Sequence, residues 1–258
     1  MLAYFRGIAK YRSLLHNLIS RDIKVKYRRS FLGILWSVLN PLFTMAVMTV
    51  VFTKMLRFQI PHFPIYYLTG QLLFNFFSDS TNMAMGSIIQ NGALLKKVYI
   101  PKYIFPLERT LFSLVNLGFS FIAICIMLIF EPVPLSWTML LSIIPILYTF
   151  VFALGIGLAL SALSIFFRDL FHLYGVVLTA WSFLTPIFYP VDLIPSNWMF
   201  MLECNPLYHF VSYLRNVFMY GVVPSIQENV VCMVMALASL AIGVLIFRKM
   251  QDKFVLYI

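Results

Sequence analysis

The chain has 258 residues, of which 62% are hydrophobic and 11% are charged, and its formal net charge is +10. A soluble globular domain carries about 25% charged residues because its surface must stay hydrated. This composition therefore excludes a water-soluble protein and predicts a chain whose outer surface faces lipid. The positive charge does not indicate a nucleic-acid partner, because that function requires a basic face on a folded soluble domain.

The chain opens with a basic segment, residues 1–30. Eight Lys or Arg residues alternate there with short apolar groups, and Leu14, Leu15, Leu18 and Ile19 fall on one helical stripe. This pattern predicts an amphipathic helix that lies in the cytoplasmic interface of the membrane. A basic tail that binds nucleic acid is the alternative, and the leucine stripe disfavours it.

Six apolar segments follow, and each is long enough for the roughly 20 helical residues that cross a bilayer. We expect transmembrane helices at Phe31–Phe52, Ile65–Ile89, Ile104–Phe130, Met139–Phe167, Leu170–Tyr189 and Val230–Phe247. The predicted fold is an all-α membrane protein with six transmembrane helices. Because no change in composition marks a second domain, residues 1–258 are expected to form one domain, with a six-span bundle over 31–247 and a tail over 248–258.

The basic residues predict the orientation. If the N-terminus is cytoplasmic, 16 of the 19 Lys and Arg residues fall in cytoplasmic segments, and only Lys54, Arg57 and Arg215 fall outside. Cytoplasmic segments of membrane proteins carry an excess of Lys and Arg. We therefore expect an even number of spans with both termini in the cytoplasm.

Two of the predicted connections are unusual. The cytoplasmic connection Gln90–Tyr103 is short and polar, whereas the external connection Pro190–Asn229 is about forty residues long and rich in Trp, Phe, Leu and Met. A segment so apolar is not expected to extend into water. We expect it to form short re-entrant helices in the outer leaflet, interrupted at its prolines. An ordinary extracellular loop packed on the helices is the alternative.

Residues for catalysis or nucleotide binding are missing. No glycine is followed by Lys-Ser or Lys-Thr, so the sequence lacks the phosphate-binding loop of ATPases. The three cysteines, Cys125, Cys204 and Cys232, do not have metal-ligand spacing, and the histidines are scattered near predicted helix ends. We therefore expect a chain that is not an enzyme and holds no cofactor or metal, so that ATP-driven transport requires another subunit.

Asp79 is the one acidic residue well inside a predicted span. It lies among Asn75, Ser78, Ser80, Thr81 and Asn82. Hydrogen bonding between helices is one interpretation of this cluster, and a polar patch beside a substrate path is the other. A separate pattern, Ala153, Gly157 and Ser161, places small residues every four positions and predicts close helix packing.

Two aromatic stripes occur at helical spacing. Trp36, Asn40, Phe43 and Val47 share one face of the first span, and Tyr174, Trp181, Thr185 and Phe188 share one face of the fifth. Aromatic faces suit sugar rings, whose axial C–H bonds pack on a ring plane while the hydroxyls reach polar neighbours. We therefore expect these stripes to face a channel for a sugar chain. Ordinary packing or lipid contact is the alternative.

Several segments together resemble a known family. They are Arg28–Pro41, Leu94–Lys97, Ile100–Lys102, Phe105–Leu107, Phe167–Asp169, Thr185–Pro190 and Asn205–Leu207, followed by Arg215. In this order the segments resemble bacterial ABC-2 type polysaccharide permeases, which export O antigen (the polymer of lipopolysaccharide), capsule or teichoic acid.

The resemblance implies an assembly and a place in the cell. Such permeases are homodimers in the bacterial cytoplasmic (inner) membrane and bind two copies of an ATP-binding ABC subunit, which holds ATP and Mg. They move lipid-linked polysaccharide, including rhamnose-rich polymers. An ABC-2 exporter of drugs or small lipids is the alternative within the family. A membrane-embedded glycan or lipid enzyme is the alternative of another class, and the missing catalytic cluster disfavours it.

The resemblance also implies roles for residues. The channel-lining residues are Trp36, Asn40, Phe43, Tyr174, Trp181, Thr185 and Phe188. The residues that couple the permease to the ATPase are Leu94, Leu95, Lys96, Lys97, Val98, Tyr99, Pro101 and Lys102. The external gate consists of Tyr189, Pro190, Asn205, Pro206 and Arg215.

Overall fold

The computed structural model describes residues 11–28, 32–131, 133 and 136–257, and these residues form helices with no strand among them. The longer helices are α2 (Arg12–Tyr27), α3 (Leu35–Thr49), α4 (Phe63–Gln90), α6 (Ile104–Phe130), α7 (Ile143–Leu163), α8 (Leu170–Leu184), α10 (Pro206–Phe218) and α11 (Ile226–Met250). The short helices are α5 (Gly92–Lys97), α9 (Met199–Glu203) and α12 (Phe254–Tyr257). A π-helical turn at Val50–Met55 extends α3, and tight helical turns lie at Trp137–Ser142, Val191–Leu193, Ser196–Trp198 and Gln251–Lys253.

A helix occupies each of the six segments that the sequence predicts as spans. Within the described residues, four helical stretches are long and apolar enough to cross a membrane, namely Leu35–Met55, Ile104–Phe130, Trp137–Leu163 and Ile226–Lys253. α4 is long enough, with 28 residues, but polar side chains along one side make it less apolar. The all-α membrane fold is confirmed for the described residues, whereas Phe31, the predicted start of the first span, lies outside them.

α8 is shorter than the predicted span Leu170–Tyr189. It ends at Leu184, and Thr185 adopts an extended backbone (φ −100°, ψ 125°) immediately before Pro186. The proline ring clashes with a helical conformation of the residue before it, which explains the end of the helix. The 15 residues of α8 span roughly 22 Å. This length is less than the about 30 Å of a bilayer's hydrocarbon core.

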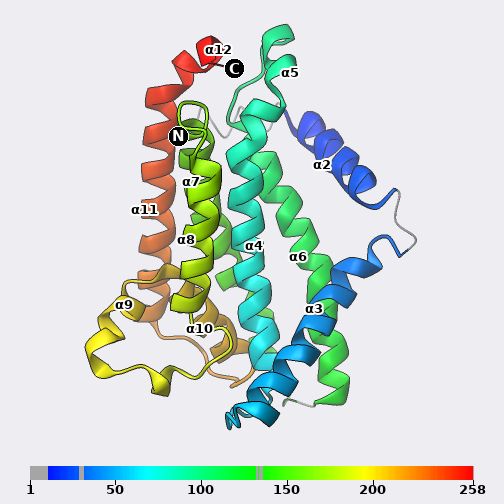
Figure 1. Cartoon of the computed structure of the whole chain (residues 1–258), viewed down its shortest axis with the longest axis vertical. Coiled ribbons are helices and arrows are strands. Elements are labelled where there is room, and N and C mark those ends of the chain that lie inside the picture. Colours follow the sequence, from blue (N-terminus) through cyan, green and yellow to red (C-terminus); the bar gives the residue numbers. More distant parts are fainter. Residues whose placement is uncertain (1–10, 29–31, 132, 134–135, 258) are drawn as a thin grey trace.

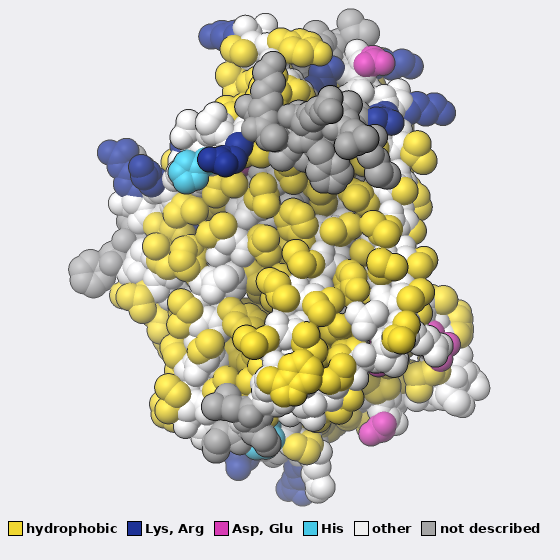
Figure 2. Space-filling view, turned by 180° about the vertical axis from the view of Figure 1, so that it is seen from behind, with side chains coloured by type: hydrophobic (Ala, Val, Ile, Leu, Met, Phe, Trp, Pro, Cys, Tyr) yellow, Lys and Arg dark blue, Asp and Glu magenta, His cyan; other side chains and the backbone are white. Residues whose placement is uncertain are grey.

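α4, α6, α7, α8 and α11 run roughly along the long axis of the molecule, with α4 in the middle (Figure 1). α4 contacts α3, α6, α7, α8 and α10. α5 and α12 lie at one end, here named the α5 end, and α9 and α10 lie at the other, named the α10 end. Figure 2 shows hydrophobic side chains over the middle of one face, with most of that face's Lys and Arg side chains toward the α5 end. An apolar band with a charged end is the surface expected of a membrane protein.

Small residues bring α7 close to two neighbours. A methyl group at Gly157 would lie 2.9 Å from the Cβ atom of Ala84 on α4. On another side of α7, a methyl group at Gly155 or at Gly243 of α11 would collide with the backbone of the opposite helix. The predicted pattern of small residues therefore does mark close packing, and Gly155 extends it to a second helix.

α2 packs on the α5 end of the bundle. Leu15 and Leu18 are buried against a cluster that includes Ile104 and Phe105 at the start of α6. These are residues of the predicted leucine stripe, so one side of the amphipathic helix is covered by protein.

Candidate substrate path and its two ends

A polar cavity of about 240 Å³ lies between α3, α4 and α6, with the end of α2 at its border. Each of the three helices contributes polar side chains three or four residues apart, which places them on one face of that helix. The three rows are Ser37, Asn40 and Thr44 on α3, Gln71, Asn75 and Asp79 on α4, and Ser113, Asn116 and Ser120 on α6. The polar and aromatic lining also includes Lys26, Tyr27, Trp36 and Phe76.

Hydrogen bonds within the lining connect α2, α3 and α6. The hydroxyl group of Tyr27 shares a hydrogen bond with the Ser37 hydroxyl and donates to Oδ1 of Asn116 at 3.0 Å. The hydroxyl of Ser120 donates to the carbonyl of Ser37 at 3.0 Å. These bonds fix the polar rows of α3 and α6 with respect to each other.

The carboxylate of Asp79 has neither a hydrogen bond nor an ion pair within the described part of the chain, and the residue is exposed to the cavity. Lys26 lines the same cavity and attracts this carboxylate electrostatically. An uncommitted carboxylate in a polar cavity is available to accept hydrogen bonds from a ligand.

The predicted polar cluster around Asp79 divides between two sides of α4. Asn75 and Asp79 line the cavity, whereas Ser80 and Thr81 are completely buried, and Thr81 accepts a hydrogen bond from Tyr174 of α8. Hydrogen bonding between helices is therefore observed for Thr81, whereas a substrate path beside Asp79 stays a prediction. The spacing of Gln71, Asn75 and Asp79 was the signal in the sequence that predicts the cavity face.

The two aromatic stripes occupy different environments. On α3, Trp36 is 47% exposed, Phe43 58% and Val47 63%, and Asn40 is exposed as well. The indole of Trp36 and the amide of Asn40 border the polar cavity. The first stripe therefore forms an open surface of the subunit beside the cavity.

The α8 stripe faces the interior of the subunit instead. Tyr174 is buried and donates a hydrogen bond of 2.6 Å to the hydroxyl of Thr81, and Thr185 is completely buried. Trp181 and Phe188 are half-buried. Polar groups on α4 and at the N-cap of α10 satisfy Tyr174 and Thr185 within the subunit, and the expectation that these two residues line a channel stays a prediction.

The predicted external-gate residues Tyr189, Asn205, Pro206 and Arg215 meet at the α10 end, and Pro190 begins the turn that follows α8. Asn205 accepts a hydrogen bond from the backbone of Leu207 and thereby caps α10. Its Oδ1 also accepts a 2.8 Å bond from Trp181, and its Nδ2 donates to Thr185 at 3.0 Å. One amide therefore joins the end of α8 to the start of α10.

Arg215 forms a second junction at this end. Its guanidinium group donates to the carbonyls of Pro186 (2.8 Å), Ile187 (3.0 Å) and Tyr66 (3.1 Å). The hydroxyl of Tyr66 donates in turn to the carbonyl of Tyr189 at 2.9 Å. The chain after α8 is thus held against α4 and α10 by bonds to its own backbone carbonyls.

The predicted coupling segment, Leu94–Lys102, begins within α5 and continues beyond its end. Some of its side chains are partly buried and others are exposed. Leu94 and Leu95 are partly buried against the apolar cluster that contains Leu15 of α2. Val98 and Tyr99 point outward, with exposed fractions of 51% and 94%. Lys96 and Lys97 are exposed, Pro101 is half-buried, and the ammonium group of Lys102 donates to the carbonyl of Gln251.

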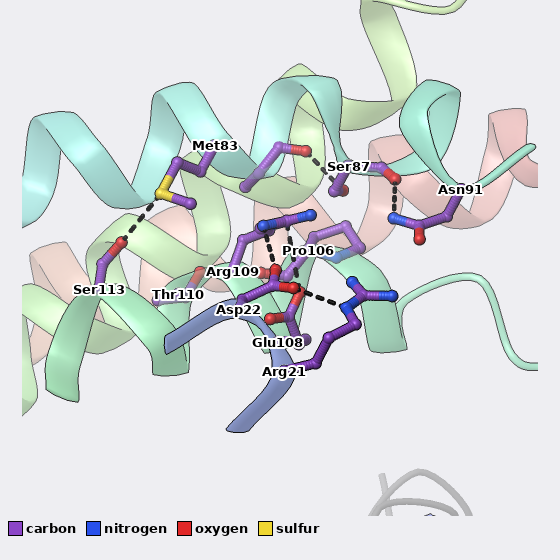
Figure 3. A network of polar contacts seen from close by, with 11 residues as sticks. Arg21, Asp22, Met83, Ser87, Asn91, Pro106, Glu108, Arg109, Thr110 and Ser113 are labelled. Atoms are coloured by element: carbon purple, nitrogen blue, oxygen red, sulfur yellow. Dashed lines mark hydrogen bonds and ion pairs between the residues drawn. The ribbon is translucent and has the colours of Figure 1, made fainter. Parts of the chain in front are cut away.

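A polar network connects α2 to α6 beside this segment (Figure 3). Asp22 accepts hydrogen bonds from Arg21, at 2.8 Å, and from Arg109. Arg109 also lies 3.3 Å from Glu108, whose side chain is almost completely buried. Oε1 of Glu108 has no hydrogen-bond partner within the described residues. The Arg109 guanidinium therefore pairs with carboxylates on two neighbouring helices, and Arg21 provides Asp22 with a second cation.

Long apolar helices that enclose a polar cavity are features of a helical membrane protein with a site for a polar ligand. A family model described as "ABC-2 type transporter" matches residues 13–219. The chain belongs to this family of membrane proteins.

Several curated proteins are similar over nearly their whole length. The chain is 31% identical to the O-antigen export system permease protein RfbA of Myxococcus xanthus, over 98% of each chain. It is 28% identical to the protein of the same name from Klebsiella pneumoniae, over 93% of each. It is 24% identical to the polysialic acid transport protein KpsM of Escherichia coli, over 91% of this chain and 92% of that protein.

Proposed function

We propose that this chain is the permease subunit of an ATP-driven exporter that moves lipid-linked cell-surface polysaccharide across the bacterial cytoplasmic membrane. The observation that carries the proposal is the 31% identity to an O-antigen export permease over 98% of both chains. Relatives named for polysialic acid and capsule polysaccharide export support the same class of substrate. The polar cavity supports it too, because amide and hydroxyl groups are the partners that sugar hydroxyls require.

The working assembly would be two copies of this chain with two copies of a separate ATP-binding subunit, since the sequence has no phosphate-binding loop. The exposed α3 stripe, which includes Trp36 and Phe43, would face the channel between the two permease subunits. Trp181 and Phe188 would reach that channel after a movement of α8. The exposed tip Val98–Tyr99 would contact the ATPase.

In the membrane, α4 and α8 would complete six spans, and α9 and α10 would re-enter the outer leaflet. The α5 end would then be cytoplasmic, because the sequence places most basic residues in cytoplasmic segments. Thiol labelling from outside the cell tests this topology. Cysteines introduced at Ser196 and Ser225 should react, and those at Lys97 and Lys253 should not.

Export itself is tested by deleting the gene for this chain in cells that make a lipid-linked polymer. Polymer should disappear from the cell surface and accumulate inside the cell. A plasmid copy of the gene should restore surface polymer in cells that contain the ATPase subunit. Normal surface polymer in the deletion strain, with altered efflux of a drug or small lipid, would contradict the proposal and favour the alternative exporter class.

A further inference from the structure

The polar cavity presents more hydrogen-bonding capacity than the protein uses. Oδ1 of Asn75 accepts a 2.8 Å bond from Gln71, which leaves its amino group directed to no partner within the described residues. Oδ1 of Asn116 accepts from Tyr27, and its amino group is likewise uncommitted. With the Asp79 carboxylate, the lining thus offers both donors and acceptors to a ligand.

The volume of the cavity excludes a single water molecule as its natural occupant. One water molecule requires a cavity volume of roughly 10–15 Å³, and this cavity has a volume of about 240 Å³. Trp36, an aromatic residue that is 47% exposed, also lines the cavity. An aromatic platform beside convergent amides and a carboxylate is the arrangement that holds a ring with apolar C–H faces and hydroxyl edges.

We propose that this cavity is a subsite for one uncharged sugar ring of the exported polymer, with Trp36 as the stacking platform and Asp79, Asn75 and Asn116 as its hydrogen-bonding partners. The proposal rests on the proposed function, because it assumes that the transported molecule is a polysaccharide. It assigns to Asp79 a role in specificity: the carboxylate accepts bonds from sugar hydroxyls and repels acidic sugars.

Other occupants fit the lining less well. A metal ion would need several anionic ligands, and no group of three or more His, Cys, Asp or Glu residues in the described chain could hold one. A phosphate group would be repelled by Asp79, with Lys26 as the single basic residue in the lining. A lipid tail would leave the amides and hydroxyls unpaired, which is costly in an apolar environment.

Occupancy of the subsite can be measured by thiol protection in the intact transporter. Cys125, Cys204 and Cys232 are first replaced, and a single cysteine is then introduced as Asn75→Cys or, for the control, as Asn82→Cys. Asn82 is an exposed amide on the same helix that does not line the cavity. Labelling with a small charged methanethiosulfonate is compared in cells with and without polymer, with the ATPase partner disabled so that polymer is stalled in the permease.

Polymer should slow the labelling of the Asn75→Cys variant several-fold and leave that of the Asn82→Cys variant unchanged. Equal labelling of Asn75→Cys in the two cell types would overturn the subsite, and so would an unreactive thiol at this position in cells without polymer. The cysteine-free parent, with an active ATPase, is tested for export in parallel. If it exports polymer and the Asn75→Cys thiol is not protected, the subsite fails alone; if no polymer is exported, the proposed function fails.

The chemical class of the occupant is tested at Asp79. Asp79→Asn keeps hydrogen-bonding groups for a sugar and should retain most export of a neutral polymer, whereas Asp79→Leu should reduce it several-fold. Asn82→Leu serves as the control for loss of a polar group from α4. Equal losses in Asp79→Asn and Asp79→Leu would indicate a charge-dependent occupant such as a cation. Normal export by Asp79→Leu would overturn the proposal.

Discussion

The guanidinium carbon of Arg215 lies 3.4 Å from the centroid of the Tyr66 ring, so the charged group stacks on the aromatic face while it donates to three backbone carbonyls. Gly70 makes room for this arrangement, because a methyl group there would lie 2.8 Å from the guanidinium. This buried arginine has no carboxylate partner among the residues that the structure describes, and it holds three segments together at the α10 end. Planarity and multiple donors make arginine suited to this position.

Arg215→Lys should therefore destabilise the subunit although it conserves the charge. An ammonium group cannot reach three carbonyls and stack at the same time, so the expected loss is about 2–3 kcal/mol, the value of one or two charge-assisted hydrogen bonds. Thermal unfolding of the purified protein in detergent measures the loss. Arg168→Lys, at an exposed position, is the matched control, and equal unfolding temperatures for the two variants would contradict the predicted role.

The contact between Gly155 and Gly243 makes a prediction for helix packing. Gly243→Ala should destabilise the protein by about 1–3 kcal/mol, because overpacking forces the α7 and α11 backbones apart. Gly118→Ala is the control, since a methyl group there would meet nothing within 4 Å. The control should be neutral or slightly stabilising, because alanine favours helix by up to about 1 kcal/mol. An unfolding temperature equal to that of wild type for Gly243→Ala would show that the helices can separate without cost.

The α5 segment allows docking and folding to be distinguished. Tyr99 is 94% exposed, so Tyr99→Asp should reduce co-purification of the ATPase subunit without changing the unfolding temperature of the permease. Leu95 packs into the apolar clusters at this end, so Leu95→Asp should lower the unfolding temperature itself. Should charge reversal at Lys97 impair export while Tyr99→Asp has no effect, the segment would act through lipid headgroups.

The shared guanidinium of Arg109 predicts an asymmetry between the partners that it joins. Arg109→Gln leaves the buried Glu108 without a cation and leaves Asp22 with Arg21 alone, whereas Asp22→Asn removes one carboxylate and leaves an Arg109–Glu108 pair. Arg109→Gln should therefore be the more destabilising change, by about 3 kcal/mol or more, since it leaves uncompensated buried charge. Thermal unfolding checks the order of the two variants.

A second substitution tests the cause of that asymmetry. Glu108→Gln should restore much of the stability lost in Arg109→Gln, because it removes the charge that the arginine no longer compensates. If the double variant is as unstable as Arg109→Gln, the loss comes from packing and not from charge.

Properties that depend on composition and on local sequence could be predicted without the structure. The high mean hydropathy and the scarcity of charges were sufficient to predict an all-helical membrane protein. Inside a lipid bilayer every backbone N–H and C=O group must be hydrogen-bonded within the protein, and a helix meets this requirement at every turn. The end of α8 at Leu184 was also implicit in the sequence, since Pro186 disfavours helix at the residue before it. The predicted span nonetheless extended past Pro186 to Tyr189, because the residues after the proline are apolar.

The orientation of each helix about its own axis was decided by the tertiary structure. The α8 stripe of Tyr174 and Thr185 and the α3 stripe of Trp36 and Phe43 have similar patterns, yet the first is buried in the subunit and the second is exposed. A side chain's environment depends on residues from other parts of the sequence that contact it in the folded chain. For the α8 stripe, these residues are Thr81 and Asn205. For the same reason the polar rows of three helices form one cavity only after α3, α4 and α6 have packed together.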